Sequence, residues 1–210
     1  MSLKNSLLNQ SQDLVFSGKT RHEKWRREQL HSLSNLLKNH QQEILNALHE
    51  DLGKPPTEAF FEIIAIKQEL KLIQKNLSSW MQAKKINVPV SLRPAQAFVQ
   101  PDPLGCILII GPWNYPFSLT LQPLVGALAA GNTAVLKPSE HAPNVSNLIK
   151  KLIEKYFPPE IVQVIEGDGS TAADLMTQQF DHVFFTGGEN IGKKVMEAAS
   201  KNLTPVTLEL

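Results

Sequence analysis

The sequence contains one unusual aromatic turn, and the asparagine side chain at its centre is a candidate for a catalytic role. The stretch Gly111-Pro112-Trp113-Asn114-Tyr115-Pro116 follows a short apolar run and has one neutral amide at its centre. In a cleft, the N–H groups of an asparagine side chain can stabilise an oxyanion. An asparagine in a turn can equally bond its own local backbone, so the sequence leaves both interpretations of Asn114 open.

A second polar turn, Lys137-Pro138-Ser139-Glu140, comes directly after a predicted strand. Loops at the carboxyl ends of strands hold the ligand in an open parallel sheet. A carboxylate at this place can accept hydrogen bonds from ribose hydroxyls, and a lysine can donate to them. The alternative is a solvated ion pair on an ordinary polar turn.

A glycine-containing turn, residues 186–192 with the sequence T-G-G-E-N-I-G, links another predicted strand to a helix. Glycines let the backbone approach a phosphate, and the amino end of a helix offers N–H donors and a positive dipole end. Gly187 and Gly192 do not form the usual G-x-G-x-x-G pattern, so the alternative is a plain strand–helix turn.

Composition narrows the class of protein. The chain has 210 residues, 21 basic and 20 acidic, which gives a formal charge of +1 and no reason to expect nucleic acid as a partner. Cys106 is the single cysteine, so we expect no internal disulfide and no metal site, and its thiol fits a reducing compartment. Its place in an apolar run favours a core residue over a nucleophile. No signal peptide or membrane-spanning segment is expected, so we expect a cytoplasmic location.

The elements that position these turns begin with a helical region. Apolar residues at three- and four-residue steps predict one helix over 21–52, ended by Gly53, and a second over 57–81 with Thr57 as its N-cap. Residues 1–83 are therefore expected to form an amino-terminal helical arm. Four prolines punctuate residues 84–103, which predicts an extended segment or edge hairpin and a candidate surface for oligomerisation.

From residue 104 to 210 short apolar strands alternate with helices. Strands are predicted at 106–110, 133–136, 161–165, 182–185 and 205–208, and helices at 119–130, 144–156, 170–178 (capped by Ser170) and 191–201. Strands that are apolar along their whole length indicate a parallel sheet covered on both faces. The predicted fold class is α/β, a Rossmann-like parallel sheet with helices on both faces, preceded by the helical arm.

Taken in order along the chain, the motifs resemble the aldehyde dehydrogenase superfamily. They are G-P-W-N-Y-P, N-T-A-V-L-K-P-S-E, F-T-G-G followed by a further glycine, and L-T-P-V-T-L-E-L. The stretches S-G-K-T-R at 17–21 and D-L-G-K at 51–54 are similar to the short dimeric class of fatty and aromatic aldehyde dehydrogenases. The resemblance covers nearly the whole chain.

This resemblance implies a role for each matching residue. Asn114 would be the side-chain part of an oxyanion hole, and Glu209 the general base. The residues implied to bind NAD or NADP share positions on turns: Lys137 and Glu140 at the adenosine ribose, Gly187, Gly188 and Gly192 at the pyrophosphate, Gly167 beside the adenine, and Ile110 and Trp113 beside the nicotinamide ribose. Gly188 departs from the serine common in the family, so we expect one hydroxyl contact to be missing and cofactor binding to be weaker.

The resemblance also implies the reaction, the oxidation of an aldehyde to a carboxylic acid by a homodimeric parent enzyme. The family's nucleophilic cysteine lies in a catalytic domain downstream of Glu209, so we expect residues 104–210 to be the cofactor-binding core and the 210 residues to be inactive by themselves. Two alternatives stay open: a free-standing nucleotide-binding module, and an acyl-CoA or acyl-phosphate reductase of the same fold. Glu209 argues against the second, because those reductases typically lack this base.

Overall fold

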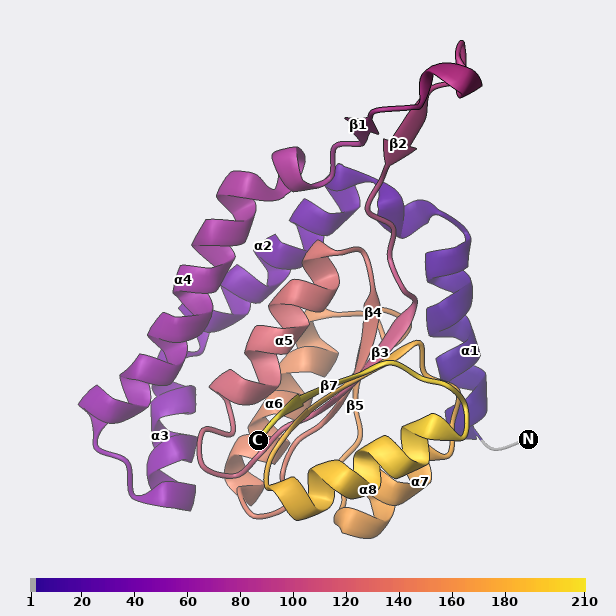
Figure 1. Cartoon of the computed structure of the whole chain (residues 1–210). Coiled ribbons are helices and arrows are strands. Elements are labelled where there is room, and N and C mark those ends of the chain that lie inside the picture. Colours follow the sequence, from indigo (N-terminus) through magenta and orange to yellow (C-terminus); the bar gives the residue numbers. More distant parts are fainter. Residues whose placement is uncertain (1–2) are drawn as a thin grey trace.

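A five-stranded sheet forms the centre of the computed structural model, which describes residues 3–210 (Figure 1). Its strands lie in the order β5–β4–β3–β6–β7, and every pairing is parallel. They are β3 (Cys106–Ile110), β4 (Thr133–Lys137), β5 (Val162–Val164), β6 (His182–Thr186) and β7 (Val206–Glu209). The predicted α/β Rossmann-like fold is confirmed, and each predicted strand is within one residue of its observed bounds at either end.

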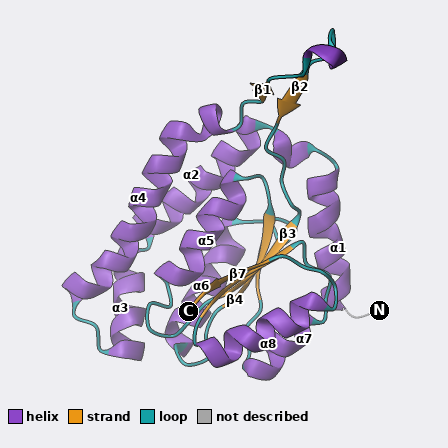
Figure 2. Ribbon diagram, viewed as in Figure 1, coloured by secondary structure: helices purple, strands orange, loops and turns teal. Residues whose placement is uncertain are grey.

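Helices cover both faces of this sheet (Figure 2). They are α1 (Leu3–Phe16), α2 (Glu23–Asn39), α3 (Gln41–Leu52), α4 (Pro56–Trp80), α5 (Ser118–Ala129), α6 (Pro143–Tyr156), α7 (Gly169–Met176) and α8 (Glu189–Ser200). One hydrophobic cluster joins the sheet to α2 through α6, and a second joins it to α7, α8 and Leu8 of α1. No helix in the part of the chain that the structure describes is long and apolar enough to cross a membrane.

The central strand β3 shows how the sequence builds two cores. Ile107 and Ile109 belong to the first cluster, whereas Cys106, Leu108 and Ile110 belong to the second. All five side chains are buried, because alternate residues of a strand point to opposite faces and both faces are covered. The uninterrupted apolar run is therefore the signature of a central parallel strand.

The helical region differs from its prediction in three places. The expected helix over 21–52 is two helices, α2 and α3, because His40 leaves the helical conformation between them with φ −123° and ψ 21°. Helix α4 begins at Pro56 with no side-chain cap, so the prediction of Thr57 as its cap was wrong; proline is well suited to the first helical turn. Helix α1 was not predicted, since only widely spaced residues such as Leu8 and Val15 reach the core.

The loop after α3 connects the helices to the rest of the fold. Gly53 ends α3 in the left-handed conformation with φ 65°, as predicted for this glycine. The carboxylate of Asp51 accepts hydrogen bonds from the backbone N–H groups of Asn144 (3.1 Å) and Val145 (2.8 Å) at the start of α6. Lys54 follows directly and turns its side chain inward, where it is buried.

A hairpin projects from one end of the molecule (Figure 1). Strands β1 (Lys84–Ile86) and β2 (Ala97–Val99) pair antiparallel, with Lys84 opposite Val99, in a two-stranded sheet separate from the central one. Of the two alternatives predicted for residues 84–103, an extended segment or an edge hairpin, the structure has a hairpin. Between its strands lies a short 3₁₀ turn, η2 (Val90–Leu92). Several apolar side chains of the hairpin, among them Val90, Leu92 and Phe98, are exposed. A role for this hairpin in oligomerisation stays a prediction.

The strand order creates a switch point at β3. The chain leaves β3 through α5 to its neighbour β4, and after β5 it returns through α7 to β6 on the other side of β3. In open α/β sheets a crevice forms outside the carboxyl ends of the strands at such a point.

Helix α7, which precedes β6, is capped by the carboxylate of Asp168, which accepts hydrogen bonds from the N–H groups of Ser170 and Thr171. The prediction of Ser170 as the cap was therefore wrong.

Candidate functional site

A cleft of about 560 Å³ lies at the carboxyl ends of β3, β4, β6 and β7. Eight of the ten predicted site residues line it, although they come from four separate strand ends: Ile110, Trp113, Asn114, Lys137, Glu140, Gly187, Gly188 and Glu209. The fold brings these residues together because all four strands are parallel and end at the same edge. The cleft coincides with the switch point of the sheet.

Lys137 and Glu140 form an ion pair on one wall of the cleft, with 2.7 Å between Nζ and Oε2. The lysine side chain is buried, and the glutamate side chain keeps 34% of its surface exposed. Burial is the largest single influence on Glu140 and by itself would raise its pKa. The hydrogen bond from Lys137, a backbone hydrogen bond and the nearby charges of Lys137 and His141 together outweigh burial, so that the pKa lies below its ordinary value. The pair therefore offers a fixed, ionised carboxylate to the cleft.

The amino end of α8 forms the opposite wall. Gly188 is the N-cap residue of α8, with φ −75° and ψ 150°. Among the residues that the structure describes, no side chain makes a capping hydrogen bond to this amino end. The first N–H groups of a helix have no partner inside the helix. Gly187 packs so closely that a Cβ there would lie 2.5 Å from the ring of Phe185. The turn thus presents bare backbone to the cleft, as an anion site requires.

Two predicted glycines lie outside the lining of the cleft. A Cβ on Gly167, whose φ is 148°, would come within 2.2 Å of Oγ1 of Thr171. A Cβ on Gly192 would come within 2.7 Å of the side chain of Leu210. The positive φ and the close approach of Thr171 explain Gly167, whereas the neighbour of Gly192 is the end of an exposed side chain that can shift. The contribution of both glycines to cofactor binding remains a prediction.

Asn114 uses only one end of its amide within the fold. Its Oδ1 accepts a hydrogen bond from the backbone N–H of Tyr115 at 3.0 Å, so the local backbone bond weighed from the sequence does form. Its Nδ2 makes no hydrogen bond among the residues that the structure describes. The bond to Tyr115 fixes which end of the amide is which, and it leaves two N–H groups able to donate into the cleft.

Glu209 ends β7 beside Thr186, its partner in the sheet register. One carboxylate oxygen accepts a hydrogen bond from Oγ1 of Thr186 at 3.0 Å. Its backbone oxygen accepts from the N–H of Gly187, also at 3.0 Å. A solvent-exposed carboxylate held in this way can accept a proton from a water molecule in the cleft.

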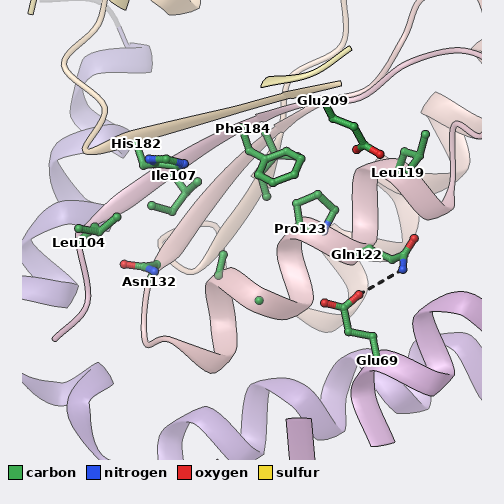
Figure 3. Close-up of a pocket in the computed structure, with 13 residues that line it drawn as sticks. Glu69, Leu104, Ile107, Leu119, Gln122, Pro123, Asn132, His182, Phe184 and Glu209 are labelled. Carbon is green, nitrogen blue, oxygen red and sulfur yellow. Dashed lines mark hydrogen bonds between the residues drawn. The ribbon is translucent and has the colours of Figure 1, made fainter. Parts of the chain in front are cut away.

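A second hollow, of about 440 Å³, adjoins the cleft and was not predicted (Figure 3). Glu209 and Leu119 line both spaces, so the two hollows meet at the general-base candidate. Its wall is mainly apolar, with Ile107 and Phe184, and its far side carries a hydrogen bond of 3.2 Å from Gln122 to Glu69. Burial raises the pKa of Glu69, and the bond from Gln122 opposes this.

The one cysteine is not part of the cleft. Cys106 is fully buried at the start of β3, and burial raises the pKa of its thiol to about 12. Because the thiolate is the nucleophile, a thiol with this pKa is unreactive near neutral pH. The core interpretation of Cys106 is the one that the structure supports.

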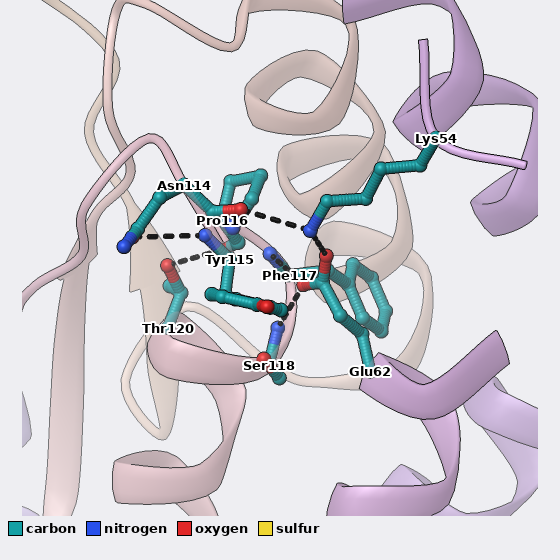
Figure 4. A network of polar contacts seen from close by, with 8 residues as sticks. All are labelled: Lys54, Glu62, Asn114, Tyr115, Pro116, Phe117, Ser118 and Thr120. Atoms are coloured by element: carbon teal, nitrogen blue, oxygen red, sulfur yellow. Dashed lines mark hydrogen bonds and ion pairs between the residues drawn. The ribbon is translucent and has the colours of Figure 1, made fainter. Parts of the chain in front are cut away.

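Sequence reasoning missed two charged residues beneath the Asn114 turn, Lys54 and Glu62 (Figure 4). They form a buried ion pair with 2.7 Å between Nζ and Oε1. A signal was present: Glu62 occupies the apolar face of α4, between Ala59 and Ile66, where a charge is out of place. Its partner lies in a different element, so the sequence did not show what satisfies it.

Comparisons with known proteins agree on one family. The family model described as "Aldehyde dehydrogenase family" matches residues 17–210. The chain is 46% identical to 4,4'-diaponeurosporen-aldehyde dehydrogenase of Staphylococcus aureus, over 89% of this chain and 41% of that protein. It is 37% identical to the dimeric NADP-preferring aldehyde dehydrogenase of Canis lupus familiaris, over 100% of this chain and 47% of that protein.

Among solved structures, the substrate-bound state of Staphylococcus aureus AldH superposes with a TM-score of 0.97 at 42% identity. The alignment covers 100% of this chain and 46% of that one. The chain therefore spans less than half the length of each of these relatives. The close agreement in fold extends over every element from the amino-terminal helices to β7.

Proposed function

The chain belongs to the aldehyde dehydrogenase family, and on this premise we propose that its cleft binds NAD or NADP for the oxidation of an aldehyde. The observation that carries the proposal is the convergence of eight predicted residues, from four strand ends, on one cleft. A dinucleotide needs a place for ribose hydroxyls, one for a pyrophosphate and one for each base. The cleft and the surface beside it offer all of these.

The donor set fits the cofactor. Glu140 would accept hydrogen bonds from the adenosine ribose hydroxyls, with Lys137 holding its carboxylate in place. The uncapped end of α8 and the bare backbone at Gly187 and Gly188 would receive the pyrophosphate. An apolar crevice between α7 and α8, lined by residues such as Ala172 and Ile191 that also border the cleft, is suited to the adenine ring.

Two side chains of this chain, Asn114 and Glu209, would take part in the reaction. Ile110 and Trp113 would border the nicotinamide of the cofactor, which when bound would supply the hydride acceptor of the oxidation. The Nδ2 group of Asn114 would donate a hydrogen bond to the oxyanion that develops on the aldehyde oxygen. Glu209 would take a proton from the water molecule that displaces the acyl group from the nucleophile as the carboxylic acid, while Thr186 keeps the Glu209 carboxylate oriented.

We assign the nucleophile of the reaction to residues outside this chain of 210. Cys106 cannot serve, because its thiol is buried in the core and stays protonated near neutral pH. The chain alone should then bind the cofactor and produce no NADH from aldehydes. Steady NADH production by the pure chain that disappears in Cys106→Ser would contradict this assignment.

Substitutions at Gly188 test the cofactor site. A Cβ at this position meets no heavy atom within 4 Å and the backbone is extended, so side chains fit without strain. Gly188→Asp would cap α8 and stabilise the fold, yet its carboxylate would repel a pyrophosphate. Gly188→Ser would also cap the helix and would add the hydroxyl that the family commonly supplies.

We expect NADH affinity, measured by fluorescence titration of the three chains, to fall at least about tenfold in Gly188→Asp. The serine variant should bind NADH at least as well as the natural chain. Thermal unfolding of all three chains controls for folding, and neither variant should be less stable. Equal affinity in the aspartate and serine variants would rule out a pyrophosphate at the end of α8.

A further inference from the structure

The turn that carries Asn114 rests on the buried pair of Lys54 and Glu62, which comes from the loop after α3 and from helix α4 (Figure 4). Their side chains are 8% and 1% exposed. Nζ of Lys54 donates to Oε1 of Glu62 at 2.7 Å and also to the backbone oxygen of Asn114 at 2.8 Å. The ion pair therefore contacts the turn at the residue whose side chain faces the cleft.

Lys54 fixes the backbone of the turn on one side. Its ammonium group lies 3.9 Å from the centre of the Tyr115 ring, which adds a cation–π contact to the bond with Asn114. In Figure 4 the Asn114 side chain extends to the side of the turn opposite Lys54. Lys54 therefore holds the backbone of Asn114, and the hydrogen bond from the N–H of Tyr115 to Oδ1 orients the side-chain amide relative to that backbone.

Glu62 fixes the other end of the same turn. Its Oε2 accepts hydrogen bonds from the backbone N–H groups of Phe117 (3.1 Å) and Ser118 (2.9 Å). These groups belong to the amino end of α5, where a carboxylate is favoured by the helix dipole. Thr120 adds a bond from its hydroxyl to the backbone oxygen of Pro116 at 2.7 Å, so the turn is attached to the fold at successive residues.

An apolar pair could fill this space. Replacing a buried ion pair by well-packed hydrophobic residues is often neutral or stabilising, because two charges lose their hydration on burial. The neighbours of Glu62 on α4, such as Ala59 and Ile63, are apolar and fully buried. An apolar pair could not orient the backbone of the turn. The hydrogen bonds to Asn114, Phe117 and Ser118 define where each part of the turn lies.

We infer that Lys54 and Glu62 are positioning residues, which hold the 113–118 turn so that the Nδ2 group of Asn114 points into the cleft. The inference rests on the proposed function, because it gives a purpose to the direction of that amide. Neither residue touches the substrate or the cofactor in this account. They act through the backbone of the turn.

Amide hydrogen exchange by NMR tests this on the chain itself. We compare the natural chain with Lys54→Met, with Lys54→Gln, and with Lys151→Met as the matched control. Lys151 also pairs with a glutamate, Glu43 at 3.0 Å, but on the surface and on another element. The amide of Leu136 in β4 serves as the reference for opening of the whole fold.

In Lys54→Met we expect exchange of the Tyr115 amide to accelerate about tenfold or more relative to Leu136. The two Nδ2 proton signals of Asn114 should move together toward those of a free amide. Lys54→Gln keeps a donor and should restore part of both readouts, and it carries the test if the methionine variant does not fold. Lys151→Met should match the natural chain.

Unchanged Tyr115 exchange and Asn114 signals in a folded Lys54 variant would overturn the inference. Equal acceleration of every amide would do the same, since it would show a purely structural role. NADH titration of the same samples keeps the two proposals apart. A natural chain that fails to bind NADH contradicts the cofactor proposal, whereas the exchange pattern reports on the turn alone.

Discussion

Two lysine–glutamate pairs in this molecule have the same bond length and different surroundings. Lys137–Glu140 and Lys54–Glu62 both measure 2.7 Å from nitrogen to oxygen. Glu140 is 34% exposed and opens on the cleft, whereas Glu62 is 1% exposed and bonds only to the protein. The difference lies in what remains for a ligand: Glu140 keeps acceptor capacity facing solvent, and Glu62 spends its oxygens on Lys54 and on helix α5.

This comparison separates binding from support. A ligand site needs polar groups that are fixed but incompletely satisfied, so that the ligand completes them. A support needs groups that are fully satisfied, since a buried charge without partners is strongly unfavourable. On this basis we expect the two pairs to respond to substitution in opposite ways.

The largest expected effect is on stability, at the buried pair. Glu62→Ala leaves the ammonium group of Lys54 buried without its carboxylate and leaves the N–H groups of Phe117 and Ser118 without an acceptor. We expect the free energy of unfolding to fall by roughly 3–5 kcal/mol. Urea denaturation measures this. A loss below about 1 kcal/mol is what an ordinary surface ion pair contributes, and it would contradict the supporting role of Lys54 and Glu62.

The next effect is on cofactor choice, at the cleft pair. A carboxylate beside the ribose repels a 2′-phosphate, so we expect Glu140→Gln to shift the ratio of NADPH to NADH affinity toward NADPH by about tenfold. Its effect on stability should stay under about 1 kcal/mol, because Glu140 is a third exposed. Titration of both cofactors against both chains measures the ratio. An unchanged ratio would remove Glu140 from the ribose site.

The smallest expected effect is a loss of stability at low pH. The pKa of Glu140 in the fold lies below its ordinary value of 4.5, so the unfolded chain binds this proton first as the pH falls. The stability that Glu140 contributes is therefore present above about pH 4.5 and is lost as the pH falls through the folded pKa. Glu140→Gln has no such titration. The difference in urea midpoint between the two chains should shrink below pH 4.5, and a difference that grows there would contradict the assignment.

How far the sequence could predict these regions follows from the range of the interactions. Lys137 and Glu140 stand three residues apart after a strand, so a local pattern contains the whole pair. The strands were likewise predictable, because an apolar run in a parallel sheet depends mainly on its own residues. The resemblance to a family then supplied the roles that composition and spacing left open.

The buried pair could not be predicted in the same way. Lys54 and Asn114 lie 60 positions apart, and only the packing of α4 against α5 brings Glu62 to the turn. The break at His40 and the cap at Asp168 were also missed, since both depend on which of several similar residues leaves the helix. The hollow beside Glu209 had no sequence signal, because its walls come from separate elements.

One paired measurement tests the account most directly, the NADH affinity of Lys137→Met and Lys54→Met, with Lys151→Met as control. Removal of Lys137 should weaken NADH binding by roughly 10- to 100-fold, since it frees the Glu140 carboxylate that we propose as the partner of the ribose hydroxyls. Removal of Lys54 should leave the affinity within about threefold, a change under about 1 kcal/mol, although the fold becomes less stable. Equal losses in the two variants, or none in Lys137→Met, would contradict the division between a binding pair and a supporting pair.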